Sequence, residues 1–335
     1  DVCSSDLEAL NSGRYDPDTT ALMLTQTGGG CRASNYIHLL RKALKGKYPQ
    51  VPVISLNFSG LEKEGGFHLT VPIIMKLLFA VLYGDLLMLL YNQCRPYEMI
   101  PGDTDKVLHQ WEKTLQENFL KNKFLGTAKT YKKILDDFAK IKRSKIKKIK
   151  VGIVGEIYVK YSPLANNHLE DFLISEGCET VMPSLLDFVL YCAINNVNDG
   201  KIYGFKNKGT FTFKLGYDII YGKQKQMIKI IKEHGVFEPS HDFEHMRRES
   251  DKYINQGVKM GEGWLIPAEM AALAASGTEN IICAQPFGCL PNHIVAKGMS
   301  RVIKQSFPNA NIVAIDYDPG ATKVNQENRI KLMLA

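Results

Sequence analysis

The sequence predicts an α/β protein made of two units, each with a parallel sheet. In both halves a short apolar strand is followed by a helical pattern and then by another strand. This order is typical of parallel sheets, because parallel neighbours need a crossover connection. The chain has 335 residues, of which 45% are hydrophobic and 23% charged, so it is long enough for two globular domains.

The first unit is expected to contain a strand over 21–24, a helix over 33–44 and a strand over 51–56. Between the first strand and the helix, residues 25–36 read Thr-Gln-Thr-Gly-Gly-Gly-Cys-Arg-Ala-Ser-Asn-Tyr. Glycines lack a Cβ, so the backbone N–H groups of Gly28, Gly29 and Gly30 can approach a bulky or anionic group.

Cys31 follows these glycines where the helix begins, and a helix N-terminus lowers the pKa of a thiol. The turn therefore suits a thiolate held against a metal cluster. A tight turn with a buried free cysteine is the alternative. A phosphate cradle fits less well, because the Walker pattern requires Lys and Ser or Thr after the last glycine.

The second unit begins with a nearly continuous apolar run over 151–159, which is typical of a central parallel strand. Glu156 is placed inside this expected strand. A buried carboxylate needs a partner or a function, so Glu156 is either a salt-bridge residue or a candidate catalytic group. The remaining expected elements are strands over 180–182, 280–284 and 311–315, and helices over 71–120 with breaks at its prolines, 129–142, 166–176, 185–194, 217–233, 242–252, 267–275 and 291–305.

A second cysteine loop, Gln-Pro-Phe-Gly-Cys-Leu-Pro-Asn-His over 285–293, resembles the first in layout. Cys289 follows a glycine and precedes a helix with Pro291 in its first turn. Ligands collect at the carboxyl ends of parallel strands, so Cys31 and Cys289 favour one shared site. The geometry suits an iron–sulfur cluster, although a cubane takes three or four thiolates. We expect His293 to donate a hydrogen bond near this loop rather than to ligate a metal.

The other cysteines are expected to be core or incidental thiols. The seven cysteines are an odd number, are scattered, and follow no recognisable secretory signal, which favours a reducing cytoplasm over a disulfide framework. Cys283 lies in an expected strand, and its Cys-x5-Cys spacing to Cys289, with no second close pair, disfavours a structural zinc site.

Membrane and nucleic-acid functions are disfavoured. The apolar stretch 71–91 approaches the length of a membrane span, but Lys76 and Asp85 lie inside it, so we expect a buried helix. Much of the net charge of +7 lies in the run 140–150, which has no interleaved aromatic residues. Such a run is expected to be a solvated helix end and linker.

Residues 1–7, Asp-Val-Cys-Ser-Ser-Asp-Leu, read as the translation of a sequencing-adapter oligonucleotide, and we expect them to be non-native. The first unit is then truncated at its N-terminus. The expected organisation is a partial α/β domain over 8–105, a helical and basic linker region over 106–150, and a second α/β domain over 151–335.

Six motifs make the chain resemble the 2-hydroxyacyl-CoA dehydratase-related family, which includes the double-cubane cluster proteins. The likeness is greatest to the C-terminal portion of large members fused to an ATP-dependent activase. The motifs are Thr-Gly-Gly-Gly-Cys-Arg-Ala-Ser-Asn-Tyr at 27–36, Val-Pro-Val-Ile-Ser-Leu at 51–56, Arg-Pro-Tyr-Glu at 95–98, Val-Gly-Ile-Val-Gly-Glu-Ile at 151–157, the loop 285–293, and Ile-Asp-Tyr-Asp-Pro-Gly at 315–320.

The resemblance implies two flavodoxin-like (Rossmann-like) domains with added helices around a [4Fe–4S] cluster or a double cubane. Cys31 and Cys289 match ligating cysteines of the family, whereas its upstream Cys-Tyr-Pro-type loop has no match here. An ATP-dependent activase, absent from this chain, would supply low-potential electrons under anaerobic conditions. The substrate would be reduced or, if a 2-hydroxyacyl-CoA, dehydrated. A homodimer or an intramolecular pairing is expected.

Two other functions stay open at this stage. One is a non-catalytic electron-relay or regulatory module without its own substrate pocket. The other is a metal-free site that binds a phosphorylated ligand at the triple-glycine turn. In the leading interpretation Gly28 to Gly30 approach the cluster, Cys31 and Cys289 ligate it, and Glu156 and His293 transfer protons or support the ligands.

Overall fold

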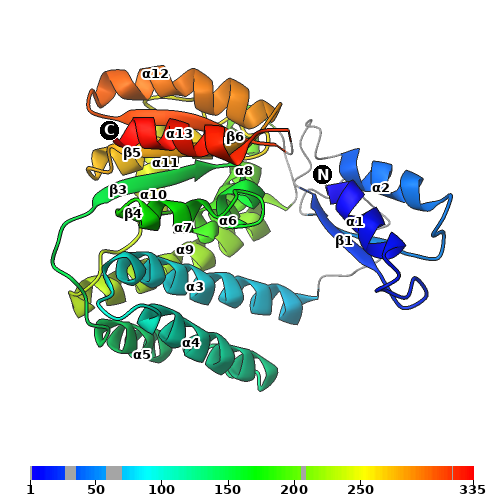
Figure 1. Cartoon of the computed structure of the whole chain (residues 1–335), viewed down its shortest axis with the longest axis horizontal. Coiled ribbons are helices and arrows are strands. Elements are labelled where there is room, and N and C mark those ends of the chain that lie inside the picture. Colours follow the sequence, from blue (N-terminus) through cyan, green and yellow to red (C-terminus); the bar gives the residue numbers. More distant parts are fainter. Residues whose placement is uncertain (1, 27–34, 58–69, 205–208, 319) are drawn as a thin grey trace.

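The protein is an α/β structure with two parallel sheets, as the sequence predicts (Figure 1). The computed structural model describes residues 2–26, 35–57, 70–204, 209–318 and 320–335. Two strands form the first sheet and four form the second.

The N-terminal unit contains α1 (Val2–Asn11), β1 (Leu22–Gln26), α2 (Tyr36–Leu44) and β2 (Val53–Asn57). The two strands are parallel, with Leu22 opposite Val53, so the expected strand, helix, strand order is confirmed. Its small core contains Leu10, Ile37, Leu40, Leu44, Val51 and Val53.

The four-stranded sheet is built from β3 (Ile149–Gly155), β4 (Cys178–Val181), β5 (Asn280–Pro286) and β6 (Asn311–Tyr317). Its strand order is β4-β3-β5-β6, and every pair is parallel. The chain therefore moves from β3 to one side of the sheet for β4 and to the other side for β5. In α/β proteins, ligands bind at the carboxyl ends of the strands where the strand order reverses in this way.

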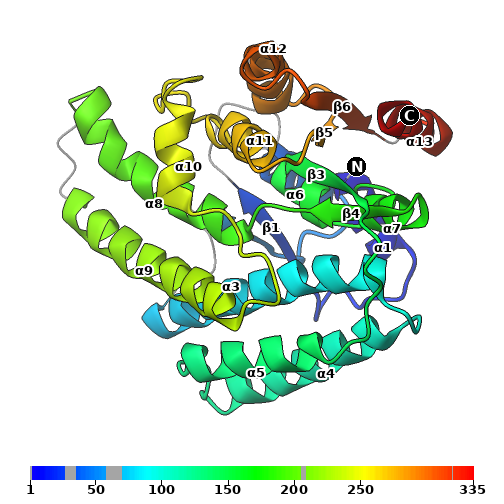
Figure 2. The same cartoon turned by 90° about the vertical axis from the view of Figure 1, so that its left-hand side faces the viewer.

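Helices cover both faces of this sheet (Figure 2). One apolar cluster joins the sheet to α7 (Leu169–Ser175) and α13 (Lys323–Leu334). Another joins it to α11 (Leu265–Ala275) and α12 (Lys297–Ser306). The sheet is thus buried on both sides, which explains its apolar strands.

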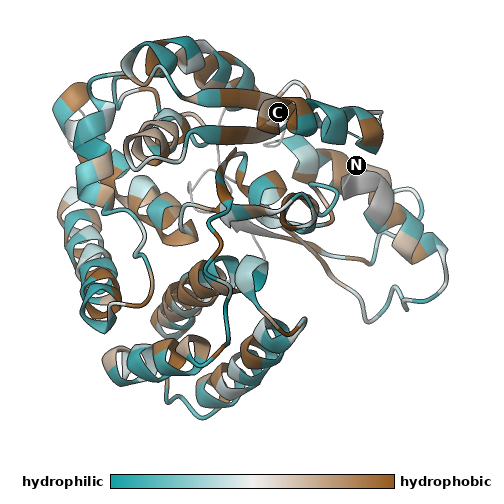
Figure 3. Cartoon of the chain, turned by 60° about the vertical axis from the view of Figure 1, so that its left-hand side comes forward, coloured by the Kyte–Doolittle hydropathy of each residue, from teal (hydrophilic) through white to brown (hydrophobic). Residues whose placement is uncertain are grey.

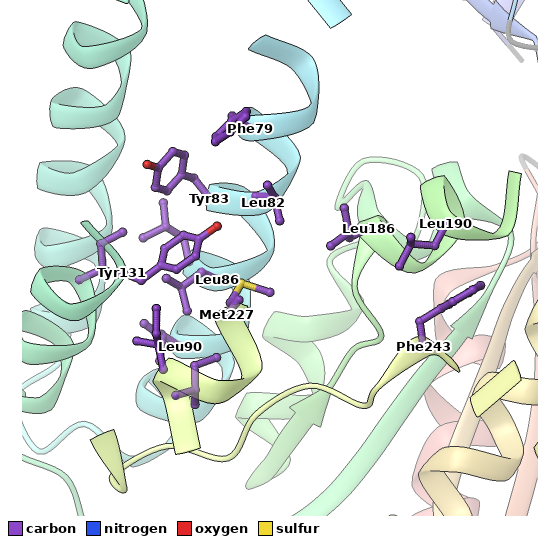
Figure 4. Close-up of a cluster of buried hydrophobic side chains, with 14 of the residues drawn as sticks. Phe79, Leu82, Tyr83, Leu86, Leu90, Tyr131, Leu186, Leu190, Met227 and Phe243 are labelled. Carbon is purple, nitrogen blue, oxygen red and sulfur yellow. The ribbon is translucent and has the colours of Figure 1, made fainter. Parts of the chain in front are cut away.

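A helical layer packs beside the sheet around its own core. Figure 4 shows Tyr131 of this layer beside Tyr83 and Leu86, and the two tyrosine rings lie 5.5 Å apart. The layer comprises α3 (Val71–Cys94), η2 (Arg95–Tyr97), α4 (Asp103–Leu120), α5 (Thr127–Ala139), α8 (Leu185–Ile202), α9 (Thr210–His234) and α10 (Phe243–Ser250). The expected domain boundaries stay a prediction.

Among the described residues, one helix, Val71–Tyr97, is long and apolar enough to cross a membrane by length and composition. Its second half is buried in the helical layer, with Leu82, Leu86 and Leu90 fully enclosed, whereas Val71 at its start is 73% exposed. Figure 3 colours the chain by hydropathy, and its helices carry both apolar, brown segments and hydrophilic, teal ones. The expectation of a buried helix therefore holds for the second half of α3.

The expected strand over 151–159 is wrong beyond Gly155. Gly155 has φ +128°, and a Cβ there would lie 2.0 Å from the carbonyl oxygen of Ala284, so only glycine fits. The chain then turns into the short helix α6 (Ile157–Tyr161), and Glu156 caps it. An apolar run such as 157–159 does not distinguish strand from buried helix by pattern alone.

Residues 195–216 are polar, and their sequence shows no clear helix or strand pattern. In the structure, α8 extends to Ile202 and α9 begins at Thr210. Helix α8 continues to Ile202 because its buried amides find partners: Asn195 accepts a hydrogen bond from the Trp264 indole, and Asn198 donates to Gln256. Lys142, Lys145 and Lys147 of the basic run are exposed, as expected for a solvated linker.

Candidate functional site

The candidate site lies at the carboxyl ends of β3 and β5, where the strand order reverses. Glu156 follows β3, and Cys289 follows β5 in a turn closed by a hydrogen bond from its N–H to the Pro286 carbonyl at 3.3 Å. In Figure 1 these strand ends point toward the N-terminal unit. The two loops are therefore placed where α/β proteins bind ligands.

The sulfur of Cys289 is half-buried and is held by an amide. Asn292 donates a hydrogen bond from Nδ2 to Cys289 Sγ at 3.2 Å. Asn292 lies on η3 (Pro291–Ala296), a π-helical segment that leads into α12, and its side chain is fully buried. Burial raises the pKa of Cys289, and the hydrogen bonds from Asn292 act in the opposite direction.

His293 is held between the Cys289 loop and the next strand. Its Nδ1 lies 3.1 Å from the Cys289 carbonyl oxygen, and its Nε2 lies 3.4 Å from Asp316 Oδ1 at the end of β6. Gln285 donates to the same Asp316 oxygen at 2.6 Å. The expectation that His293 makes hydrogen bonds beside this loop is therefore confirmed in the structure.

Two carboxyl groups meet at the start of α6. Glu156 Oε2 accepts the Val159 N–H at 2.8 Å, and Glu262 Oε1 accepts the Ile157 N–H at 3.3 Å. Burial raises the pKa of Glu156. Burial and the nearby charge of Glu156 together raise the pKa of Glu262 to about 7.

The loop that carries Glu262 packs closely against the start of η3. Gly261 has φ +57°, and a Cβ there would lie 2.7 Å from Pro291 Cγ. Glycine allows this approach, which brings Glu262 near the Cys289 loop. The charges of Glu262 and Glu156 accordingly raise the pKa of Cys289. The site thus combines one thiol with two carboxyl groups.

A separate group of charges, which we call the buried charge cluster, consists of Asp85, Lys160, Asp187 and Glu269. Lys160 Nζ lies 3.0 and 3.2 Å from the two carboxylate oxygens of Glu269. Asp85 accepts the N–H groups of Leu185 and Leu186, both at 2.8 Å, at the start of α8. These bonds join α6 to α11 and α3 to α8.

A cavity of about 120 Å³ reaches the buried charge cluster from the side of β4. Its lining includes Asp187, Glu269, Thr180 and His241, which lies in the loop before α10. Asp187 Oδ1 accepts a hydrogen bond from Gln224 at 2.7 Å. Burial raises the pKa of Asp187 to about 7 and lowers that of His241.

Three of the predicted site residues, Glu156, Cys289 and His293, lie at one edge of the four-stranded sheet. The others, Gly28, Gly29, Gly30 and Cys31, lie outside the described residues. The expected position of Glu156 inside a strand is wrong, because Glu156 is the N-cap of α6; its side chain is half-buried, and this burial raises its pKa.

The cysteines expected to be structural are unpaired and mostly buried. Cys94 donates to the Phe138 carbonyl at 3.9 Å, and Cys178 to the Glu176 carbonyl at the same distance. Cys283 is buried in β5, as expected, but its sulfur also lies 3.5 Å from Asn292 Oδ1. Cys283 is therefore linked to the Cys289 site through one amide.

Within the described ranges, no three His, Cys, Asp or Glu side chains are grouped so as to hold a metal ion. The donor set that is described fits one position of an iron–sulfur cluster: a half-buried thiol that accepts an N–H hydrogen bond. Further cysteine ligands would have to come from residues outside the described ranges, such as Cys31.

Sequence reasoning missed four residues of the site: Glu262, Gln285, Asn292 and Asp316. Gln285 and Asp316 belong to the last residues of β5 and β6, and strand ends are where such side chains converge. Glu262 stands between Gly261 and Gly263, both with positive φ, so the signal was a carboxylate in a tight glycine turn.

Comparisons with protein families, with curated proteins and with solved structures find no match to this chain.

Proposed function

We propose that this chain is an iron–sulfur cluster module that accepts low-potential electrons from an ATP-dependent activase. The observation that carries the proposal is the placement of Cys289, whose thiol stands at the strand-order reversal and accepts an N–H bond. Cysteine thiolates are the usual ligands of iron–sulfur clusters. The motif resemblance to 2-hydroxyacyl-CoA dehydratase-related proteins supports the same function.

The second ligand in this proposal is Cys31. Its loop follows β1, as the Cys289 loop follows β5, and the N-terminal unit lies beyond the carboxyl ends of the four-stranded sheet (Figure 1). Gly28, Gly29 and Gly30 would let backbone N–H groups approach the sulfides of the cluster. A bound cluster would supply single electrons at low potential.

The carboxyl groups of Glu156 and Glu262 are proposed to hold and transfer protons beside Cys289. A carboxyl group with a pKa near 7 can both donate and accept a proton at neutral pH, as Glu262 can. His293 supports the loop through the Cys289 carbonyl and faces Asp316. The substrate is proposed to be a small molecule or an acyl-CoA.

The strand order β4-β3-β5-β6 supports a flavodoxin-like arrangement for the second sheet, since it reads 2-1-3-4 along the chain. We extend that arrangement to the N-terminal unit, whose parallel β1 and β2 would be part of a larger sheet. A cytoplasmic location and pairing as a homodimer, or with a second domain of a longer chain, complete the proposal.

Anaerobic reconstitution with iron and sulfide tests the proposal. Wild-type protein is expected to bind iron and sulfide in equal amounts. The Cys31→Ser and Cys289→Ser variants are each expected to lose most of the bound iron and sulfide. Cys192→Ser is the matched control, because Cys192 is a half-buried cysteine of α8. Equal iron content in all four proteins would refute the ligand assignment.

A second measurement separates an enzyme from an electron relay. If the protein reduces a substrate itself, a photoreduced cluster is reoxidised when an acceptor such as a 2-hydroxyacyl-CoA is added. If it only passes electrons on, none of the small molecules tested reoxidises it, and reoxidation requires a protein partner.

A further inference from the structure

The side-chain amide of Asn292 lies between two cysteine sulfurs. Its Nδ2 is 3.2 Å from Cys289 Sγ, and its Oδ1 is 3.5 Å from Cys283 Sγ. Both Asn292 and Cys283 are buried, with exposed fractions of 0% and 1%. The Asn292 amide therefore connects the half-buried sulfur of Cys289 with the buried sulfur of Cys283 in β5.

The chemistry of the two sulfurs favours the orientation that the amide has in the structure. Gln285 Oε1, at 3.7 Å from Cys283 Sγ, is a second and more distant acceptor for the Cys283 thiol. A buried thiol donates its S–H to an amide oxygen, whereas a ligating thiolate only accepts. With Oδ1 toward Cys283 and Nδ2 toward Cys289, both contacts are favourable. The flipped amide would set its oxygen against the Cys289 thiolate, which is unfavourable, and its N–H₂ group against the Cys283 sulfur, which is only a weak acceptor.

The backbone around Asn292 restrains the same loop. The His293 N–H donates to the Cys289 carbonyl at 2.8 Å, and His293 Nδ1 lies 3.1 Å from the same oxygen. The main chain of Cys289 is thus held by His293 and its sulfur by Asn292. Both belong to the π-helical segment η3, and π-helical turns occur often at functional sites.

We infer that Asn292 is a positioning residue for the sulfur of Cys289, and that Cys283 holds the Asn292 amide in the donating orientation. This inference rests on the proposed function in one respect: the sulfur is taken to be a cluster ligand. An N–H bond to a ligating sulfur stabilises its negative charge and favours the reduced cluster.

The first test is the midpoint potential of the reconstituted cluster. Asn292→Ala is expected to favour the oxidised form about tenfold, a downward shift of about 59 mV for one electron. Asn198→Ala, a buried asparagine of α8 hydrogen-bonded to Gln256, is the matched control and is expected to leave the potential unchanged. An unchanged potential in Asn292→Ala would overturn the inference.

The role of Cys283 has its own variants. Cys283→Ala removes the donor to Asn292 Oδ1. It is expected to lower the midpoint potential, as Asn292→Ala does, but by a smaller amount. Cys283→Ser keeps a donor in place and is expected to restore most of the wild-type value. Equal shifts in the alanine and serine variants would show that Cys283 does not orient the amide.

The second readout needs no cluster. The metal-free protein is treated with a thiol-reactive disulfide dye. The reaction rate of Cys289 is obtained by subtracting the reaction of the Cys289→Ser variant from that of the protein that contains Cys289. Asn292→Asp replaces the N–H donor with a carboxylate and is expected to slow this reaction at least tenfold, whereas Asn198→Asp leaves it unchanged. An unaffected rate would contradict the contact. If wild-type protein binds no iron, the proposed function fails while this result still decides the role of Asn292.

Discussion

Two groups of buried or half-buried carboxyl groups in this protein differ in what surrounds them. In the buried charge cluster, Glu269 faces Lys160, Asp85 accepts two helix N–H groups, and Asp187 accepts a hydrogen bond from Gln224. At the carboxyl edge of the sheet, Glu156 and Glu262 lie near each other and near the Cys289 thiol. The carboxyl groups of the cluster thus contact groups that connect helices, whereas those at the edge of the sheet lie beside a thiol, and only the latter enter the proposed function.

The largest effect on stability is expected from breaking the Lys160–Glu269 pair. Glu269→Ala leaves a lysine that is 1% exposed without its carboxylate, which typically costs about 3–5 kcal/mol. Urea unfolding measures the loss. The double variant Lys160→Met with Glu269→Leu is expected to recover most of the stability, because it removes both charges. A single variant as stable as wild type would show that the cluster is not structural.

The next largest loss of stability is expected from Asp85→Ala. It removes the acceptor for the Leu185 and Leu186 N–H groups and is expected to cost about 2–3 kcal/mol in urea unfolding. Asp85→Asn keeps one acceptor oxygen and is expected to lose less. If both variants lose the same amount, the charge of Asp85 matters more than its hydrogen bonds.

The pH dependence of stability sharpens the same contrast. Burial raises the pKa of Asp85, Asp187 and Glu262 to about 7 in the folded protein, whereas unfolded carboxyl groups titrate near 4. Between these values the folded state binds more protons, so the contribution of these groups to stability falls as pH rises from about 4 to about 7.

Asp187→Asn tests this dependence, because the amide has no proton to lose. Unfolding free energies at pH 5.5 and 8 are compared between this variant and the wild type. The difference between the two pH values is expected to be smaller in Asp187→Asn by about 1–2 kcal/mol. If the difference in unfolding free energy between pH 5.5 and 8 is the same in Asp187→Asn as in the wild type, Asp187 does not titrate between these pH values in the folded protein.

The smallest effect is expected at Thr180, which lines the cavity beside the buried charge cluster. Its hydroxyl is buried without a hydrogen-bond partner, so Thr180→Val is expected to change the unfolding free energy by less than about 0.5 kcal/mol, or to stabilise. A loss above about 1 kcal/mol would show that the hydroxyl has a partner in the cavity.

Local patterns predicted most of the fold. The strands around Leu22, Val53 and Ile282 are short apolar runs bounded by turns, and the breaks in the long helical region fall at prolines, where an N–H is missing. The error at 156–159 arose because the end of β3 is set by Ala284, a residue far along the chain that requires glycine at 155.

Site residues were predicted from the sequence only where they lie in loops with a recognisable local pattern. Cys289 and His293 follow a glycine turn, which the sequence displays. The glycines on both sides of Glu262 are a local signal, but the packing of Gly261 on Pro291, which brings Glu262 to the site, has no local pattern, and neither has the π-helical turn that carries Asn292. Long-range packing of this kind is decided by the fold as a whole.

The central claim is that the sulfurs of Cys31 and Cys289 meet at one site. In a variant that keeps only these two cysteines, a short bifunctional thiol reagent tests it directly. The account predicts an intramolecular cross-link that disappears when either cysteine is replaced by serine. Complete reaction of both thiols with a monofunctional reagent, but no cross-link with the bifunctional one, would contradict it.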